Sequence, residues 1–164
     1  MEDVEIGRLR AGDIDGVLAL QEANQAEGGG TLSARMPRGF FEAALDGMPV
    51  MVARREGRVV GFLVSAAKLP LPEAPVVRAM LRAWPGGPDA YVYGPVCVAA
   101  EHRGRGLAAA MFAALRVLLP GREGVLFIRT DNAASIRAHA KMGISQVASF
   151  EHEGAAMLVL AYAG

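Results

Sequence analysis

Hydrophobic and polar positions follow two rhythms in the first part of the chain. Residues 4–12 alternate apolar and polar side chains, which is typical of a strand with one buried face. Residues 14–27 repeat apolar side chains at helical spacing behind Asp13, a residue type favoured at helix N-caps. A break at Gly28-Gly29-Gly30 precedes a second helical pattern over residues 33–48. The pattern predicts one strand followed by two helices.

The middle of the chain predicts a hairpin, an insertion and an interrupted strand. Residues 49–66 form two β-branched runs on either side of a tight turn at Glu56-Gly57. Residues 70–90 are rich in proline and carry one short helical pattern, so we interpret them as an insertion. Residues 90–98 are aromatic and β-branched, but Gly94-Pro95 interrupts them. Because proline cannot donate to a ladder, we predict a bulge that splays this strand from a neighbour.

The last part of the chain alternates helices and strands. Helices are predicted over residues 106–120 and 132–143, and strands over residues 124–130, 145–153 and 155–163. The apolar side chains of the first of these helices predict a buried stripe of Leu107, Met111, Leu115 and Leu118. The whole order predicts an α/β protein of mixed α+β type. We expect one central, mixed, twisted sheet of about six or seven strands, with helices on both faces and a bulged, splayed fourth strand.

Size and charge narrow the function classes. The chain has 164 residues, which suits a single domain over residues 1–164. It carries 17 basic and 17 acidic residues, so no global field attracts nucleic acid or an anionic membrane, and any anion site must be local. No run approaches the roughly 18 apolar residues that span a membrane. The N-terminus begins with an acidic stretch and has no signal segment, so a cytoplasmic protein is expected.

Cysteine and histidine usage argues against a metal cofactor. Cys97 is the one cysteine of the sequence, so no internal disulfide can form. The three histidines, His102, His139 and His152, lie far apart, and no Cys/His cluster has zinc-site spacing. We therefore expect no metal site.

The most informative stretch is "CVAAEHRGRGLAAAMF", residues 97–112, in which a strand passes through a basic glycine turn into a helix. The first N–H groups of a helix lack internal partners and carry roughly half a positive charge, which favours anions. Gly104 and Gly106 let the backbone approach a diphosphate without a Cβ in the way, and Arg103 and Arg105 add charged donors. The turn is expected to hold a phosphate group, although a flexible turn with two solvated arginines is the alternative.

Two established phosphate templates fit poorly. Gly104, Gly106 and Ala109 satisfy the dinucleotide fingerprint G-x-G-x-x-G/A between a strand and a helix. That fold normally begins with the fingerprint, whereas here about 100 residues precede it and one β-α-β unit follows. The Walker loop is absent, because the chain has no Gly-Lys-Ser/Thr sequence.

A third pattern fits better. The stretch "VAAEHRGRGLA" resembles the phosphate loop of the GCN5-related N-acetyltransferase (GNAT) superfamily, Arg/Gln-x-x-Gly-x-Gly/Ala after a bulged strand, with Arg103, Gly106 and Ala108 at its fixed positions. A second motif of that superfamily is an asparagine eleven residues before a glycine, which Asn132 and Gly143 match. The resemblance covers almost the whole chain, and the element order agrees with it.

The resemblance implies acetyl-CoA as the donor co-substrate. It implies a pyrophosphate on the backbone of the loop, which comprises Arg103, Gly104, Arg105, Gly106, Leu107 and Ala108. It also implies a pantetheine arm that pairs like an extra strand with Val96, Cys97 and Val98. The expected oxyanion donor is a backbone N–H near Cys97 or Val98.

One departure from the family pattern concerns the proton donor. Where the family usually has a tyrosine thought to protonate the departing thiolate, this chain has His139. At about 100° per residue, Asn132, Ser135 and His139 fall within roughly 60° on one helix face, so all three are candidates to line the donor site. Histidine, with an ordinary pKa near 6.5, suits proton transfer near neutral pH. His139 could equally hydrogen-bond the CoA sulfur or pantetheine, or face CoA or the core edge with no chemical role.

The general base is unassigned from the sequence. The acids Glu42, Asp89, Glu101 and Glu151 are each expected to be solvated surface residues. An acetylated Cys97 is disfavoured, because free cysteine is usually a small buried hydrophobe.

The expected activity is transfer of an acetyl group from acetyl-CoA to a primary amine by direct attack. The acceptor stays open among small amines, antibiotics, amino acids and protein amines. The alternative is a non-catalytic acyl-CoA-binding or regulatory module. Tyr162 is expected in the core, and packing is also preferred over an acceptor pocket for most of Phe40, Phe41, Trp84 and Tyr91. A homodimer is possible by family resemblance.

Overall fold

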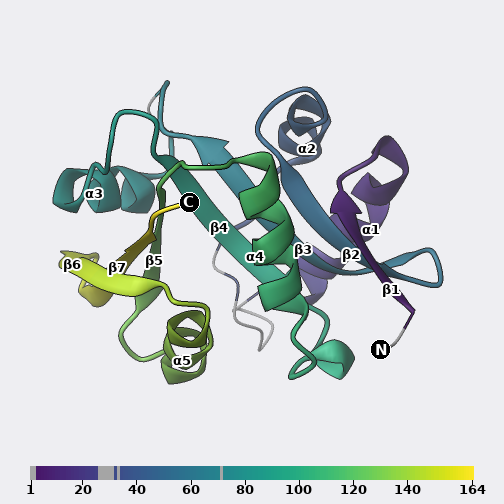
Figure 1. The fold of residues 1–164 in the computed structure, drawn as a ribbon. Helices are drawn as coiled ribbons and strands as arrows, with labels where there is room; N and C mark the ends of the chain where they lie inside the picture. The colour runs from purple at the N-terminus through teal and green to yellow at the C-terminus, as the bar shows by residue number, and fades with distance from the viewer. Residues whose placement is uncertain (1–2, 26–31, 33, 71) are drawn as a thin grey trace. The chain divides into compact units, whose positions relative to one another are not determined.

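The structure is a computed structural model that describes residues 3–25, 32, 34–70 and 72–164. Its helices and strands follow the expected order: β1 (Val4–Arg8), α1 (Ile14–Ala23), α2 (Arg38–Ala44), β2 (Val50–Arg55), β3 (Arg58–Ala67), α3 (Pro75–Ala83), β4 (Tyr91–Val98), α4 (Leu107–Leu118), β5 (Gly124–Arg129), α5 (Ala133–Lys141), β6 (Ser145–His152) and β7 (Ala155–Tyr162) (Figure 1). The seven strands lie in the order β1-β2-β3-β4-β5-β7-β6, so the predicted mixed α/β class is confirmed. The glycine break at residues 28–30 lies outside the described residues.

The chain forms two compact units. The first comprises Met1–Ser65 and Gly94–Leu118, and the second comprises Ala66–Tyr93 and Leu119–Gly164. Each unit has its own cluster of buried hydrophobic residues. That the chain acts as one domain over residues 1–164 stays a prediction.

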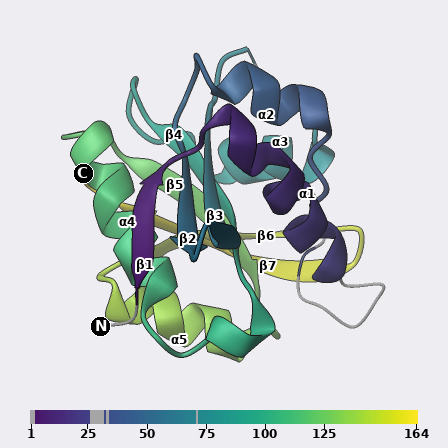
Figure 2. The same ribbon diagram turned by 90° about the vertical axis from the view of Figure 1, so that its right-hand side faces the viewer.

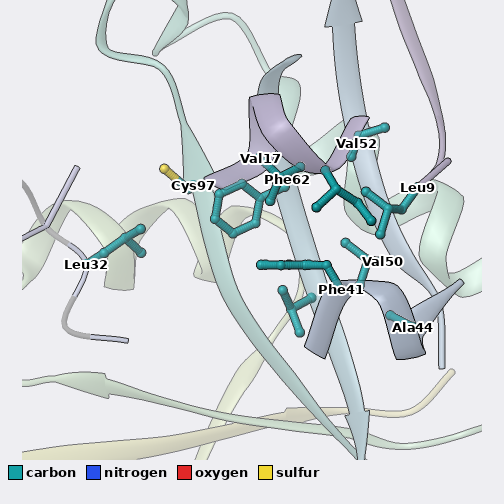
Figure 3. Packing of buried hydrophobic residues seen from close by; sticks show 11 residues of the cluster. Leu9, Val17, Leu32, Phe41, Ala44, Val50, Val52, Phe62 and Cys97 are labelled. Carbon is teal, nitrogen blue, oxygen red and sulfur yellow. The ribbon is translucent and has the colours of Figure 1, made fainter. Parts of the chain in front are cut away.

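The first unit is built on the antiparallel ladder of β1, β2 and β3. Figure 2 shows α1 and α2 on one side of these strands and α4 on the other. Val50, Val52 and Phe62 point to the side of α1 and α2, where they pack with Val17 and Phe41, all fully buried (Figure 3). Helices therefore cover both faces of this part of the sheet, as the sequence predicted.

Two glycines of the first unit, Gly57 and Gly61, have structural reasons. Glu56 and Gly57 have positive φ angles of 52° and 76°, which the tight turn between β2 and β3 requires. A Cβ at Gly61 would lie 3.2 Å from the Met111 Cε atom, so glycine lets α4 pack closely on β3.

The second unit pairs β5 with β7 and β7 with β6 in antiparallel fashion. β4 enters it in parallel with β5 at Tyr91 and Val92, and Gly94, directly beyond, has a φ of 109°. β4 itself runs unbroken through Gly94-Pro95 to Val98, and the bulge and splay predicted there stay a prediction. The insertion carries α3, which starts with Pro75 in its first turn and packs against β6.

Three details differ from the expectations. Leu118 is 44% exposed whereas Leu119 is buried, because the i+4 steps from Leu107 through Leu115 continue to 119. The second helix covers only Arg38–Ala44 of the predicted segment. Asp13 precedes α1, but its carboxylate makes no cap hydrogen bond to that helix and instead accepts hydrogen bonds from Arg54.

Among the described residues, no helix has both the length and the apolar character needed to cross a bilayer.

Candidate functional site

The basic glycine turn leads from β4 into α4 (Figure 1). Gly104 and Gly106 have φ angles of 78° and 80°, a left-handed conformation that side chains rarely adopt. A Cβ placed on either glycine would meet no heavy atom of the described residues within 4 Å, so these residues leave the space beside this backbone open. A ligand group can therefore approach the loop backbone where glycine is present.

The helix that follows supplies the positive end of a dipole. α4 has 12 residues, long enough for its aligned peptides to favour an anion at its first turn. The side chain of Leu107 is buried in the core, so only its backbone N–H is suited to contact a ligand, while Ala108 is half-buried. Arg105 is exposed beside the same turn.

The Arg103 side chain has a more specific place than the sequence suggested. Its Nε donates to the Val98 carbonyl at 3.1 Å, and its guanidinium donates to Asn24 Oδ1 at 2.7 Å. Asn24 is buried at the end of α1, and its own amide donates to the Leu20 carbonyl. Arg103 thus ties the end of β4 to α1 in the first unit, and its guanidinium anchors the turn instead of pointing freely to solvent.

The strand segment before the loop places Cys97 in the core. Cys97 is 5% exposed among the residues of the first cluster (Figure 3). Burial raises the pKa of its thiol to about 11, although the charge of Arg103 acts in the opposite direction. A thiol with this pKa is protonated at neutral pH and is a poor nucleophile. Val96 and Val98 beside it are half-buried.

Asn132 and Ser135 meet at the start of α5. Asn132 is the N-cap of this helix, and its side chain accepts a hydrogen bond from the Ser135 backbone N–H at 3.2 Å. Both side chains are half-buried. Their predicted contact with the donor stays a prediction, and the observed role of Asn132 is to cap the helix that carries His139.

His139 lies inside the second unit and is 3% exposed. Its Nδ1 is 2.8 Å from the Ser135 carbonyl oxygen, and its Nε2 is 3.1 Å from the hydroxyl of Tyr93 on β4. The two rings meet edge to face with centroids 5.5 Å apart. Burial lowers the pKa of the imidazole from 6.5, with the Ser135 carbonyl acting partly against it, so His139 is neutral at neutral pH.

The remaining predicted residues behave as core or surface. Tyr162 is buried, and its hydroxyl pairs with that of Tyr91, also buried. Phe41 is fully buried, and Trp84 donates its indole N–H to Glu123. These observations agree with the preference for packing. All four acids considered as a general base, Glu42, Asp89, Glu101 and Glu151, are exposed.

Sequence reasoning missed two residues. Asn24 is 79 positions from Arg103, and Tyr93 is 46 positions from His139, so no local pattern connects either pair. The signal for Tyr93 is a buried hydroxyl that needs a hydrogen-bond partner.

A cavity of about 390 Å³ lies in the second unit, beside Ile136, Ile144 and Leu158, and none of the predicted site residues lines it. Among the described part of the chain, no group of three or more His, Cys, Asp or Glu side chains is arranged to hold a metal ion.

A mixed seven-stranded sheet, with a glycine turn leading from its fourth strand into a helix, defines the class of GNAT-fold proteins. The family described as "Acetyltransferase (GNAT) family" matches residues 18–144, most of the chain, and the protein therefore belongs to this family. Membership indicates acetyl transfer in general. A comparison with curated proteins gives no significant match.

Solved structures agree on the fold. An N-acetyltransferase from Staphylococcus aureus Mu50 has a TM-score of 0.73 at 18% identity and covers 99% of both chains. The putative acetyltransferase yncA from Salmonella typhimurium, solved with its cofactor acetyl-CoA, has a TM-score of 0.73 at 19% identity, covering 99% of this chain and 94% of that one. A ribosomal-protein-alanine N-acetyltransferase from Brucella melitensis has a TM-score of 0.71 at 23% identity, covering 98% and 99%.

Proposed function

We propose that this protein is an N-acetyltransferase that transfers the acetyl group of acetyl-CoA to a primary amine by direct attack. The observation that carries the proposal is the turn at Gly104 and Gly106, whose left-handed backbone lies beside open space at the start of α4. Family membership and a structural neighbour solved with acetyl-CoA support the choice of donor.

The residues present fit such a donor. The backbone N–H groups of residues 104–108 would hold the pyrophosphate, because the helix dipole and the glycines favour an approaching diphosphate. Arg105 adds a positive charge beside them, whereas Arg103 holds the loop in place through Val98 and Asn24. The backbone of Val96, Cys97 and Val98 would pair with the pantetheine arm. Bound acetyl-CoA supplies the thioester that the amine attacks.

Direct attack, without an acetylated enzyme, is favoured by the state of Cys97. Its thiol is buried, and its pKa of about 11 keeps it protonated. The amine must attack as the neutral base, so a group of the protein or a water molecule has to accept a proton.

His139 is the proposed proton-transfer residue, as its position in the family motif implies. The imidazole is neutral and its Nδ1 lies beside the Ser135 carbonyl, so Nδ1 carries the proton and the unprotonated nitrogen is Nε2, which faces Tyr93. Asn132 caps the helix that carries His139, and the Ser135 carbonyl holds its ring in place.

The class of amine acceptor is to be determined by a screen of candidate amines. Two structural neighbours are the ribosomal-protein-S18-alanine N-acetyltransferase from Escherichia coli and a ribosomal-protein-alanine N-acetyltransferase from Brucella melitensis. A peptide with an N-terminal alanine therefore belongs in the panel beside small amines, amino acids and lysine peptides. Residence in the cytoplasm and assembly as a homodimer stay predictions.

The test begins with calorimetric titration of the protein with acetyl-CoA, desulfo-CoA and a dinucleotide. We expect binding of the two CoA compounds and none of the dinucleotide. Gly106→Val should weaken acetyl-CoA binding at least about tenfold, because a side chain would occupy the space beside the loop. Gly57→Val is the matched control, since Gly57 has a φ of 76°, open space around it and no place in the site.

The results separate the possibilities. Equal affinity of folded Gly106→Val and Gly57→Val for acetyl-CoA would overturn the phosphate assignment. Binding of acetyl-CoA without release of free thiol in the presence of any amine would identify the protein as a non-catalytic acyl-CoA-binding module. Release of thiol with one class of amine would establish both the activity and the acceptor.

A further inference from the structure

The first four residues of the proposed phosphate loop, residues 103–106, are exposed and lie between two buried side chains of the first unit. His102 before them is 9% exposed, and Leu107 after them is 3% exposed. Leu107 is an apolar core residue at the start of α4. A buried imidazole is costly unless its nitrogens are hydrogen-bonded, so packing alone does not account for His102 at the other end of the loop.

The two nitrogens of His102 have different surroundings. Its Nε2 is 3.3 Å from Nη1 of Arg55, the last residue of β2 in the same unit. A guanidinium only donates, so Nε2 accepts this hydrogen bond, and the proton of the neutral ring is on Nδ1. Nδ1 is buried and has no hydrogen-bond partner among the described residues. The ring therefore uses one nitrogen to hold Arg55.

This hydrogen bond ties the start of the loop to β2, 47 positions earlier in the chain. Ala99, directly before the short helical turn that carries His102, donates its N–H to the Val60 carbonyl on β3 at 2.8 Å. Arg103 donates to Asn24 on the side of α1. The loop thus begins from a segment held on β2, β3 and α1, and of these three contacts the one with Arg55 uses an acceptor that titrates.

Protonation of His102 abolishes this contact. An imidazolium carries a proton on both nitrogens, so Nε2 becomes a donor and no longer accepts the hydrogen bond of Arg55. Two positive groups then face each other at the foot of the loop, which is unfavourable. The tie between His102 and Arg55 therefore exists only while the imidazole is neutral.

We propose that His102 is a positioning residue for the donor: its neutral ring accepts the hydrogen bond of Arg55 and so holds the start of the phosphate loop in the geometry that binds acetyl-CoA, and its protonation in acid releases the loop. The proposal rests on the proposed function. His102 acts through the loop and does not itself contact the donor, since its Nδ1 is buried and its Nε2 faces Arg55.

The elements around this part of the first unit carry more arginine than acid. Their charged residues lie on β1, β2, the start of β3, the last turn of α4 and the turn of His102 itself, and they are Glu5, Arg8, Arg54, Arg55, Arg58, Arg116, Glu101 and Arg103. Glu5 is already paired with Arg10 and Arg54. Among the described residues, Arg55 is the charged group within hydrogen-bond distance of the His102 ring. A further positive charge on this ring adds to the surplus, which agrees with release of the loop in acid.

The chain offers matched variants for the test. His102→Gln keeps an oxygen that accepts from Arg55 but does not titrate, whereas His102→Phe keeps a ring that has no acceptor. Arg58 is opposite Arg55 in the register of β2 and β3 and is exposed. Arg55→Met and Arg58→Met each remove one arginine from this hairpin, but only the first removes the partner of His102. Urea unfolding shows whether each variant folds.

The experiment measures acetyl-CoA affinity by calorimetric titration from about pH 5 to about pH 8, the range in which histidine titrates. Phosphate groups of the ligand titrate there as well, so the informative quantity is the ratio of the affinities of two proteins at the same pH.

At the upper end of this range we expect the wild type, His102→Gln and Arg58→Met to agree within about threefold, and His102→Phe and Arg55→Met to bind about tenfold more weakly. At the lower end the wild type should bind about tenfold more weakly than His102→Gln. The nitrogen spectrum of the wild-type His102 ring at the upper end should show a proton on Nδ1 and none on Nε2.

Three results would overturn the proposal and leave the proposed function intact. They are a wild type that binds as tightly as His102→Gln, or more tightly, at the acid end; equal affinity of Arg55→Met and Arg58→Met at the upper end; and a wild-type His102 ring with its proton on Nε2. The last two decide even where His102→Gln does not fold. A wild type that binds no acetyl-CoA at any pH overturns the proposed function, and the role of His102 in donor binding with it.

Discussion

The contact between Asn24 and Arg103 gives a prediction that separates loop positioning from stability. Asn24→Leu removes the oxygen that accepts the Arg103 guanidinium at 2.7 Å and the amide that donates to the Leu20 carbonyl at 2.9 Å. Asn24 is 7% exposed, so the loss occurs largely out of water. Arg103 would keep its contact with Val98 but lose its tie to α1.

The magnitude follows from the chemistry of the bond. A hydrogen bond to a charged group contributes about 1.5 to 3 kcal/mol, and the lower end applies because Arg103 is partly solvated. We expect Asn24→Leu to lower the free energy of unfolding by about 2 kcal/mol. If the loop then spends most of its time away from the binding geometry, acetyl-CoA affinity should fall about tenfold, which corresponds to roughly 1.4 kcal/mol.

The assay pairs urea unfolding with calorimetric titration of acetyl-CoA, and Gln25→Leu is the control. Gln25 is a neighbouring buried amide, 6% exposed, that donates to the carbonyls of Gln21 and Ala34, and among the described residues it makes no hydrogen bond to Arg103. Both variants should lose stability, but only Asn24→Leu should lose affinity, and Asn24→Asp, which keeps the accepting oxygen, should restore it. Equal affinities of the two leucine variants would refute the reasoning.

Two further predictions concern other parts of the first unit. Burial opposes ionisation of Asp13 and so raises the pKa of its carboxyl. The hydrogen bonds that it accepts from Arg54 and from the Arg10 backbone, together with the charge of Arg54, outweigh burial, so this pKa is below 3.8. Since this pKa is depressed, the pair stabilises the fold at neutral pH and the benefit is lost as the pH falls through 3.8 and then the folded-state value. Asp13→Asn leaves the Arg54 charge buried and should lower the free energy of unfolding by about 3 kcal/mol near pH 7 and by less in acid. Unfolding curves in which this loss does not change with pH would contradict the prediction. Cys97→Ala should keep kcat within about threefold, with no acetylated enzyme by intact mass in the wild type, and a transient acetyl adduct lost in the variant would contradict direct attack.

Local sequence patterns predicted most of the helices and strands. The alternation over residues 4–12 and 49–66 predicted β1, β2 and β3, because a half-buried strand needs side chains of period two. The glycine of the Glu56-Gly57 turn has the positive φ that the turn demands. The family motif around Arg103, Gly106 and Ala108 located the loop for the same reason, since a glycine turn before a helix is a property of consecutive residues.

Contacts between distant segments decided the rest. The hydrogen-bond partner of His139 Nε2 is the distant Tyr93, and the direction of the Arg103 guanidinium depends on Asn24. The exposure of Leu118 and the burial of Leu119 depend on which side of the last turn of α4 meets the core.

The sequence by itself determined the order of elements, the glycine loop and the family, since each is written in residues close together in the chain. Only the tertiary structure decided what the polar side chains do. A hydrogen bond needs its donor and acceptor within about 3 Å, and Asn24 and Tyr93 reach Arg103 and His139 only when segments far apart in the chain pack together.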